Sequence, residues 1–98
     1  MKNKQPNEDV EVAVFPRESG QAYAAADRRK IQRLVRENVL SKSKETYHKA
    51  QVAVSHDPDG SPNALTVTLL RANTYTADVV TVKVDRDYNM KSVEPAKF

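Results

Sequence analysis

The feature that most constrains this chain is an alternation of apolar and mostly polar residues in three runs of its second half. Every second residue in each run is apolar, and most of these are β-branched or leucine. The apolar sets are Ala50, Val52 and Val54; Leu65, Val67 and Leu69; and Val80, Val82 and Val84. A period of two predicts strands with one buried face. Turn-forming residues between the runs predict antiparallel connections.

The first half of the chain predicts one more strand and a helix. Valine alternates with other residues from position 10 to position 14, and Pro16 ends the run. Ser19 is expected to cap a helix that stops near Leu40. The apolar residues of this helix fall in one sector about 140° wide, which predicts the side that packs on the sheet. They are Ala24, Ile31, Leu34, Val35 and Val39.

The order strand, helix, strand, strand, strand predicts a single α+β domain over residues 9–95. One N-terminal helix is expected to pack on one face of a twisted antiparallel sheet of three to five strands. Residues 1–8 are interpreted as a flexible tail and residues 96–98 as a C-terminal tail. Residues 91–95 either add a short last strand or trail off.

The composition narrows the possible chemistry of this 98-residue chain. It has no cysteine, which excludes disulfides, thiolate zinc sites and thiol nucleophiles. Its net charge of +3 comes from 16 basic and 13 acidic residues, a mixture that suits solubility better than strong polyanion binding. No arrangement of a nucleophile, a base and an acid is visible, so we expect neither an enzyme nor a cofactor.

The beginning of the chain, "MKNKQPNEDV", is mostly charged and polar. It has no apolar stretch behind its lysines, and no later segment is long enough to span a membrane. We therefore expect no signal peptide and no membrane span. The compartment stays open: cytoplasmic if the chain is complete, and periplasmic if a leader has been removed.

The stretch "SHDPDGSPN" invites comparison with a calcium loop, because Asp57, Asp59 and Ser61 are spaced like its first oxygen ligands. Pro62 stands where such a loop needs glycine, and Thr68 stands where it needs glutamate. Chain reversal explains the same residues, since proline presets φ and Asp-Gly tolerates a positive φ. We predict a hairpin turn and no metal site.

The two histidines do not form a pair in this interpretation. His48 and His56 lie on one predicted strand, about 26 Å apart at the usual rise per residue. They cannot share a metal ion within one copy of the chain. Each is expected to be a half-exposed residue near a strand end.

One helix cannot cover both faces of the sheet, so the far face is a candidate partner surface. We place Phe15, Tyr47, Leu70 and Val79 on it, among polar residues. A half-apolar uncovered face is typical of dimers and of protein partners. An ordinary wet face with scattered apolar residues is the alternative.

The outer side of the helix is a candidate polyanion surface. Arg29, Arg33 and Arg36 fall within about 60° of one another, on the side opposite the apolar sector. A basic helix over residues 28–36 can neutralise phosphates of a nucleic acid. An acidic protein surface is a second possible partner. A solvated outer face with no partner accounts for the same pattern.

The ending "VVTVKVDRDYNMKSVEP" resembles the cystatin-like α+β group, and within it PepSY-type domains and the small N-terminal domains of copper amine oxidases. In those families alternating valines run into an aspartate, a short turn, and then a lysine or valine. Here Val84 and Asp85 precede the turn, Asn89 takes the place of its glycine, and Lys91 follows. The resemblance implies a binding or regulatory module. The run "QVAVS" lacks the pattern of the cystatin inhibitory wedge, so papain-like proteases are not expected targets.

Together these features predict a small non-catalytic module that binds a protein or associates with itself through the uncovered sheet face. Nucleic-acid or other polyanion binding through the basic helix is the alternative function.

Overall fold

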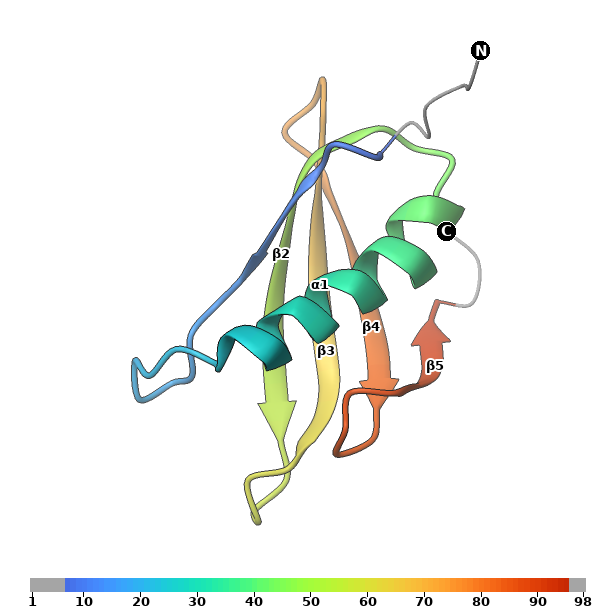
Figure 1. Ribbon diagram of the computed structural model, residues 1–98. Helices are drawn as coiled ribbons and strands as arrows, with labels where there is room; N and C mark the ends of the chain where they lie inside the picture. The colour runs from blue at the N-terminus through green and yellow to red at the C-terminus, as the bar shows by residue number, and fades with distance from the viewer. Residues whose placement is uncertain (1–6, 96–98) are drawn as a thin grey trace.

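The computed structural model describes residues 7–95 and contains one sheet of five strands, in the order β1-β2-β3-β4-β5. The helix α1 lies across one face of this sheet (Figure 1), which confirms the α+β fold with one packed helix. The elements are β1 (Glu11–Val14), α1 (Ala25–Asn38), the 3-10 helix η1 (Leu40–Lys42), β2 (Tyr47–His56), β3 (Pro62–Arg71), β4 (Ala77–Val84) and β5 (Met90–Glu94). The last of these decides the open question about residues 91–95: a short strand forms.

The first strand corrects one part of the sequence prediction. β1 pairs with β2 in parallel, with Val12 opposite Ala50, whereas the other three pairings are antiparallel. The sheet is therefore mixed, and the prediction of a wholly antiparallel sheet is wrong. The physical reason is the connection: the chain passes through α1 between β1 and β2, and a helical crossover of this kind returns a strand in the same direction.

The core lies between α1 and the sheet face beneath it. The helix contributes Ile31, Leu34 and Val35, and the segment after it contributes Val39 and Leu40. The predicted alternation is confirmed on the strands, where the inward residues include Val12, Ala50, Val52, Leu65, Val67, Leu69, Val80, Val82 and Val84. Each fully buried valine or leucine side chain contributes roughly 1.5–3 kcal/mol to folding.

The helix begins later than Ser19 predicts. Ala24 occupies the N-cap position without a side-chain hydrogen bond, and the first helical residue is Ala25. Ser19 lies in a preceding loop, where Gly20 has φ +89° and its N–H donates to Arg17 O at 2.7 Å. The helix ends at Asn38 and continues as η1, close to the predicted stop. Within residues 7–95, no helix is long and apolar enough to cross a membrane.

Asn7 corrects the predicted tail. Its side chain is buried, and Nδ2 donates to Leu40 O at 3.3 Å and to Glu45 O at 2.8 Å. Its Oδ1 accepts a hydrogen bond from Tyr47 N at 2.9 Å. Asn7 thus satisfies backbone groups at the end of the helix and the start of β2, and it belongs to the domain. The rest of the two tail predictions, over residues 1–6 and 96–98, lies outside the described residues.

Candidate functional site

The face of the sheet opposite α1, called the open face below, is the candidate partner surface. Among residues 7–95, no helix or strand lies over it (Figure 1). Its side chains form rows across the strands, and the central row runs from Gln51 through Thr68 to Val79. Val79 is 57% exposed; it pairs with Thr68 of β3, and the pairing of β4 with β5 covers only Thr81 to Val84.

The predicted partner residues occupy two separate parts of the open face. Leu70 is half-buried beside Lys49 of β2, and Val79 lies one row away, on the same end of the face. Phe15, 44% exposed, extends β1 through a hydrogen bond from its N–H to Val52 O at 2.9 Å. Along β2, the position of Leu70 and the position of Phe15 differ by about four residues, or roughly 13 Å. The open face thus has two apolar areas with threonines between them.

Tyr47 is not part of the open face, so its assignment as a partner residue is wrong. Its side chain is only 4% exposed and belongs to the core. The reason is a register shift between Tyr47 and Lys49, where β2 has one more residue than β3. A bulge of this kind inverts the alternation of side chains. Tyr47 therefore points to the helix side.

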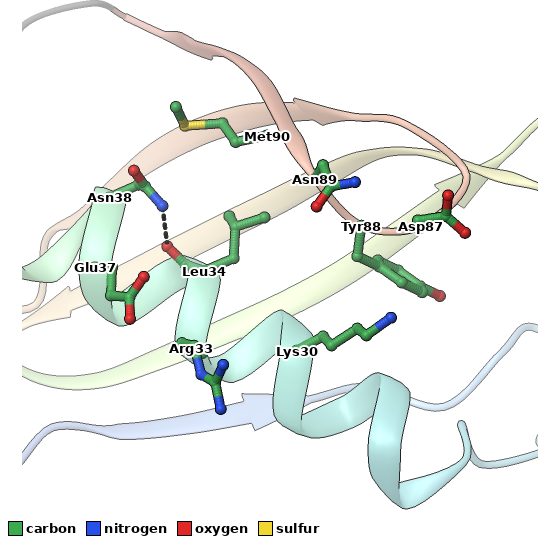
Figure 2. A pocket seen from close by; sticks show the side chains of 9 residues that line it. All are labelled: Lys30, Arg33, Leu34, Glu37, Asn38, Asp87, Tyr88, Asn89 and Met90. Carbon is green, nitrogen blue, oxygen red and sulfur yellow. Dashed lines mark hydrogen bonds between the residues drawn. The ribbon is translucent and has the colours of Figure 1, made fainter.

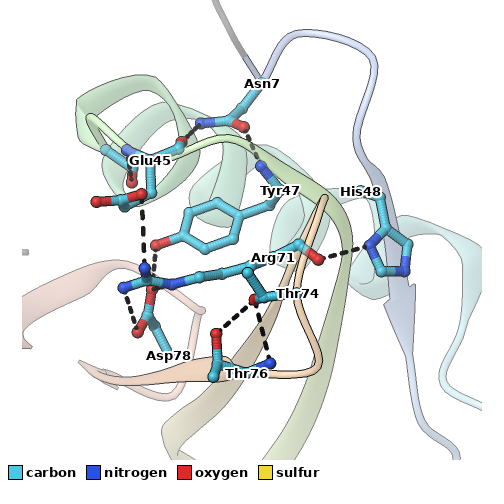
Figure 3. Close-up of polar contacts among 9 residues, drawn as sticks. Asn7, Glu45, Tyr47, His48, Arg71, Thr74, Thr76 and Asp78 are labelled. Carbon is cyan, nitrogen blue, oxygen red and sulfur yellow. Dashed lines mark hydrogen bonds and ion pairs between the residues drawn. The ribbon is translucent and has the colours of Figure 1, made fainter.

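Tyr47 takes part in a polar cluster at one end of the core (Figure 3). Its Oη donates to Asp78 Oδ2 at 2.6 Å, and Arg71 donates to both carboxylate oxygens of Asp78 at 3.1 and 3.2 Å. Glu45 adds an ion pair to Arg71 at 3.7 Å. The hydrogen bonds from Arg71 and Tyr47 hold the pKa of Asp78 below its usual value, and burial raises the pKa of Tyr47. These groups serve the fold by joining β2, β3 and β4.

A second cluster holds the loop before α1 against the end of β2. Arg17 NH1 donates to His56 Nε2 at 3.3 Å, and Tyr23 Oη lies 3.2 Å from the same nitrogen. The ring of Tyr23 stacks on His56 with 5.8 Å between centroids, and the guanidinium of Arg17 lies 4.4 Å from the centre of the tyrosine ring. Sequence reasoning missed this cluster because its members are up to 39 residues apart.

The stretch from Asp57 to Ser61 forms the turn between β2 and β3, as predicted. Asp57 N donates to Ser61 O and Gly60 N to Asp57 O, both at 2.8 Å, with Gly60 at φ +89°. The Asp59 carboxylate accepts the Ser61 N–H at 2.8 Å, which lowers its pKa. No group of three or more potential metal ligands occurs in the described part of the chain.

The arginines of the candidate polyanion surface all lie on the outer side of α1 and are exposed. We refer to Arg29, Arg33 and Arg36 as the arginine row. Arg36 NH1 donates to Glu8 O at 3.3 Å. The prediction that these three residues share one exposed side of the helix agrees with the structure.

Beside the arginine row lies a groove of about 390 Å³ between α1 and the segment that joins β4 to β5 (Figure 2). It is lined by Lys30, Arg33, Leu34, Glu37 and Asn38 of the helix and by Asp87, Tyr88, Asn89 and Met90. Burial of the Tyr88 side chain raises its pKa, and the nearby Asp27 carboxylate raises this pKa further. Sequence reasoning missed the groove because its residues come from two segments that are far apart in the sequence and meet only in the folded chain.

Comparisons of this chain with protein-family models, curated proteins and solved structures gave no match. The resemblance to the cystatin-like group therefore stays a prediction.

Proposed function

We propose that this protein is a small non-catalytic module that associates with a second copy of itself through the open face. The observation that carries the proposal is the exposure of Val79, an apolar side chain that is 57% accessible on the open face beside Thr68 of β3. A flat β face that leaves an apolar side chain exposed gains free energy when a second surface removes that area from water.

The size of the open face suits a dimer. Five strands spaced about 4.8 Å apart span roughly 24 Å, and the central strands are about 26–33 Å long. Because β1 and β5 are shorter, the face presents roughly 600 Å². A stable interface buries about 800 Å² on each partner, with considerable scatter. The face is therefore close to the required size.

The charges of the open face favour a partner of the same composition. Lys83 and Glu94 form an ion pair on it at 3.7 Å, and Lys49 stands opposite Glu11 in the register of β1 and β2. Both signs are present in equal number among these four residues. Two copies can meet without net repulsion, because each cation can lie near an anion of the other copy.

The polar clusters support a non-catalytic role. The carboxylate of Asp78 is engaged by Arg71 and Tyr47, and that of Asp59 is engaged by the turn that it closes. His56 is engaged by Arg17 and Tyr23. Each of these groups is occupied by a structural partner.

Sedimentation equilibrium with Val79→Lys tests the proposal. We expect the wild-type chain to be dimeric and the variant to be monomeric, because the interface would bury the new ammonium group without a partner. Met90→Lys is the matched control: Met90 is 41% exposed but lies beside the groove, so this variant should remain dimeric. A monomeric wild type, or equal dissociation of both variants, would contradict the proposal.

A further inference from the structure

The excess charge of the chain is concentrated on one helix. α1 contains five basic residues (Arg28, Arg29, Lys30, Arg33 and Arg36) and two acidic residues, Asp27 and Glu37. Its net charge is therefore +3, which equals the net charge of the whole chain. The remaining residues contribute no net charge, so the positive excess of the chain equals the charge of α1.

The cations of α1 are available to a ligand. Within residues 7–95, no ion pair forms at Arg28, Arg29, Lys30 or Arg33, and all four are exposed. Arg36 donates to the backbone carbonyl of Glu8, which leaves its positive charge uncompensated. By contrast, Arg71 and Lys83 of the sheet each have a carboxylate partner.

The arginine row adjoins the groove without a break. The row extends about 10 Å along the helix, at 1.5 Å per residue. Arg33 belongs to the row and also lines the groove, and Lys30 lines the groove one turn earlier (Figure 2). Leu34 and Tyr88 form the floor of the groove but are only 7% and 8% exposed, so Met90, at 41%, is its main accessible apolar side chain.

We propose that the arginine row and the groove bind the phosphodiester backbone of a single-stranded nucleic acid. Guanidinium groups match phosphate geometry and contact it through two hydrogen bonds at once. Met90 offers an apolar surface on which a base can pack, and an acidic peptide has no bases to use it. In a duplex the bases are stacked inside. Because α1 lies flat on the sheet, a duplex can contact only the arginine row, through its phosphates.

The site lies on the helix side of the sheet, opposite the open face, so it does not depend on self-association. Glu37 and Asp87 also line the groove. Their negative charges repel phosphates and keep them on the side of Lys30 and Arg33. No element of the groove reads the sequence of bases in a fixed geometry, so binding should tolerate different sequences.

Fluorescence anisotropy with a labelled thymidine oligonucleotide tests the proposal. Four phosphate contacts to a single strand give a salt slope of about −3, so the affinity should fall about 50-fold between roughly 50 and 200 mM salt. Arg29→Gln combined with Arg33→Gln should reduce this fall to about sevenfold. Arg86→Gln combined with Lys91→Gln removes the same charge from exposed positions outside the helix and should leave the fall at about 50-fold.

Three results would overturn the proposal. The first is the absence of salt-sensitive binding at low ionic strength, and the second is an equal effect of the two double variants. The third is binding of a duplex or of polyglutamate as tight as that of the oligonucleotide, because charge alone would then explain the interaction.

Discussion

Tyr47 on β2 and Asp78 on β4 are joined by a hydrogen bond that crosses above β3, with Oη 2.6 Å from Oδ2. Arg71 of the intervening strand holds the same carboxylate from the side. One carboxylate thus joins three strands at the end of the core. Since Tyr47 belongs to this cluster, only Phe15, Leu70 and Val79 of the predicted residues remain on the open face.

Removing the hydroxyl of Tyr47 should destabilise the fold without opening a cavity. Tyr47→Phe keeps the buried ring but deletes a hydrogen bond to a charged acceptor, and we expect a loss of about 1–2 kcal/mol in the free energy of unfolding. Urea denaturation measures it. Tyr75→Phe is the control, because Tyr75 is fully exposed at the turn between β3 and β4 and should show no change. A loss of equal size in both variants would remove the role assigned to the Tyr47 hydroxyl.

The pKa of Asp78 predicts how stability changes in acid. Hydrogen bonds from Arg71 and Tyr47 lower this pKa in the folded state, so the ionised form contributes stability above the unfolded value of about 3.9. That contribution is lost as the pH falls through the lower folded value. Asp78→Asn should therefore be less stable than the wild type at pH 6, and the difference should shrink below about pH 4.

Thermal unfolding at several pH values measures this convergence. Asp59 and Asp85 also have lowered pKa values, because backbone N–H groups donate to them, so the variant should still lose part of its stability in acid. A constant difference between the two proteins from pH 6 to pH 2 would contradict the role assigned to Asp78.

Asn7 should contribute more to stability than its position near the start of the chain suggests. Asn7→Ala removes three hydrogen bonds and leaves the N–H of Tyr47 without its partner, so we expect a loss of about 2–4 kcal/mol. Chemical denaturation tests this against Asn73→Ala, an exposed position that should change little. A neutral Asn7→Ala would show that the N-terminal contacts do not hold the domain together.

Calcium should leave the thermal stability of the protein unchanged. The carboxylate of Asp59 accepts the Ser61 N–H, and that of Asp57 accepts a hydrogen bond from Asn63 at 2.7 Å, so both already serve the turn. A melting temperature that rises with added calcium, and rises less in Asp59→Asn, would assign an ion site to this turn.

The pattern of valines was sufficient to predict the strands, because burial on one face imposes a period of two. It could not predict where β2 bulges, since the register shift near His48 depends on pairing with β3. The same limit applies to Asn7: an asparagine in a polar stretch has the same appearance whether it is exposed or buried. Its hydrogen-bond partners, 33 to 40 residues away, become neighbours only in the folded chain.

The same difference between local pattern and tertiary arrangement applies to the candidate surfaces. Arg29, Arg33 and Arg36 were predicted correctly as one exposed row, because helix geometry depends only on local spacing. The direction of β1 was not predictable in this way, because the pairing of β1 with β2 is decided by the path of the crossover. The groove depends on the same tertiary arrangement, since its residues come from α1 and from the segment before β5.

Cross-linking through a single cysteine tests self-association most directly, because the chain has no cysteine of its own. Thr68→Cys places a thiol in the central row of the open face, and Arg33→Cys places one on the opposite side of the molecule. With a short bismaleimide, we expect a covalent dimer from Thr68→Cys and monomer from Arg33→Cys. A monomer from Thr68→Cys, or equal yields from both variants, would contradict association through the open face.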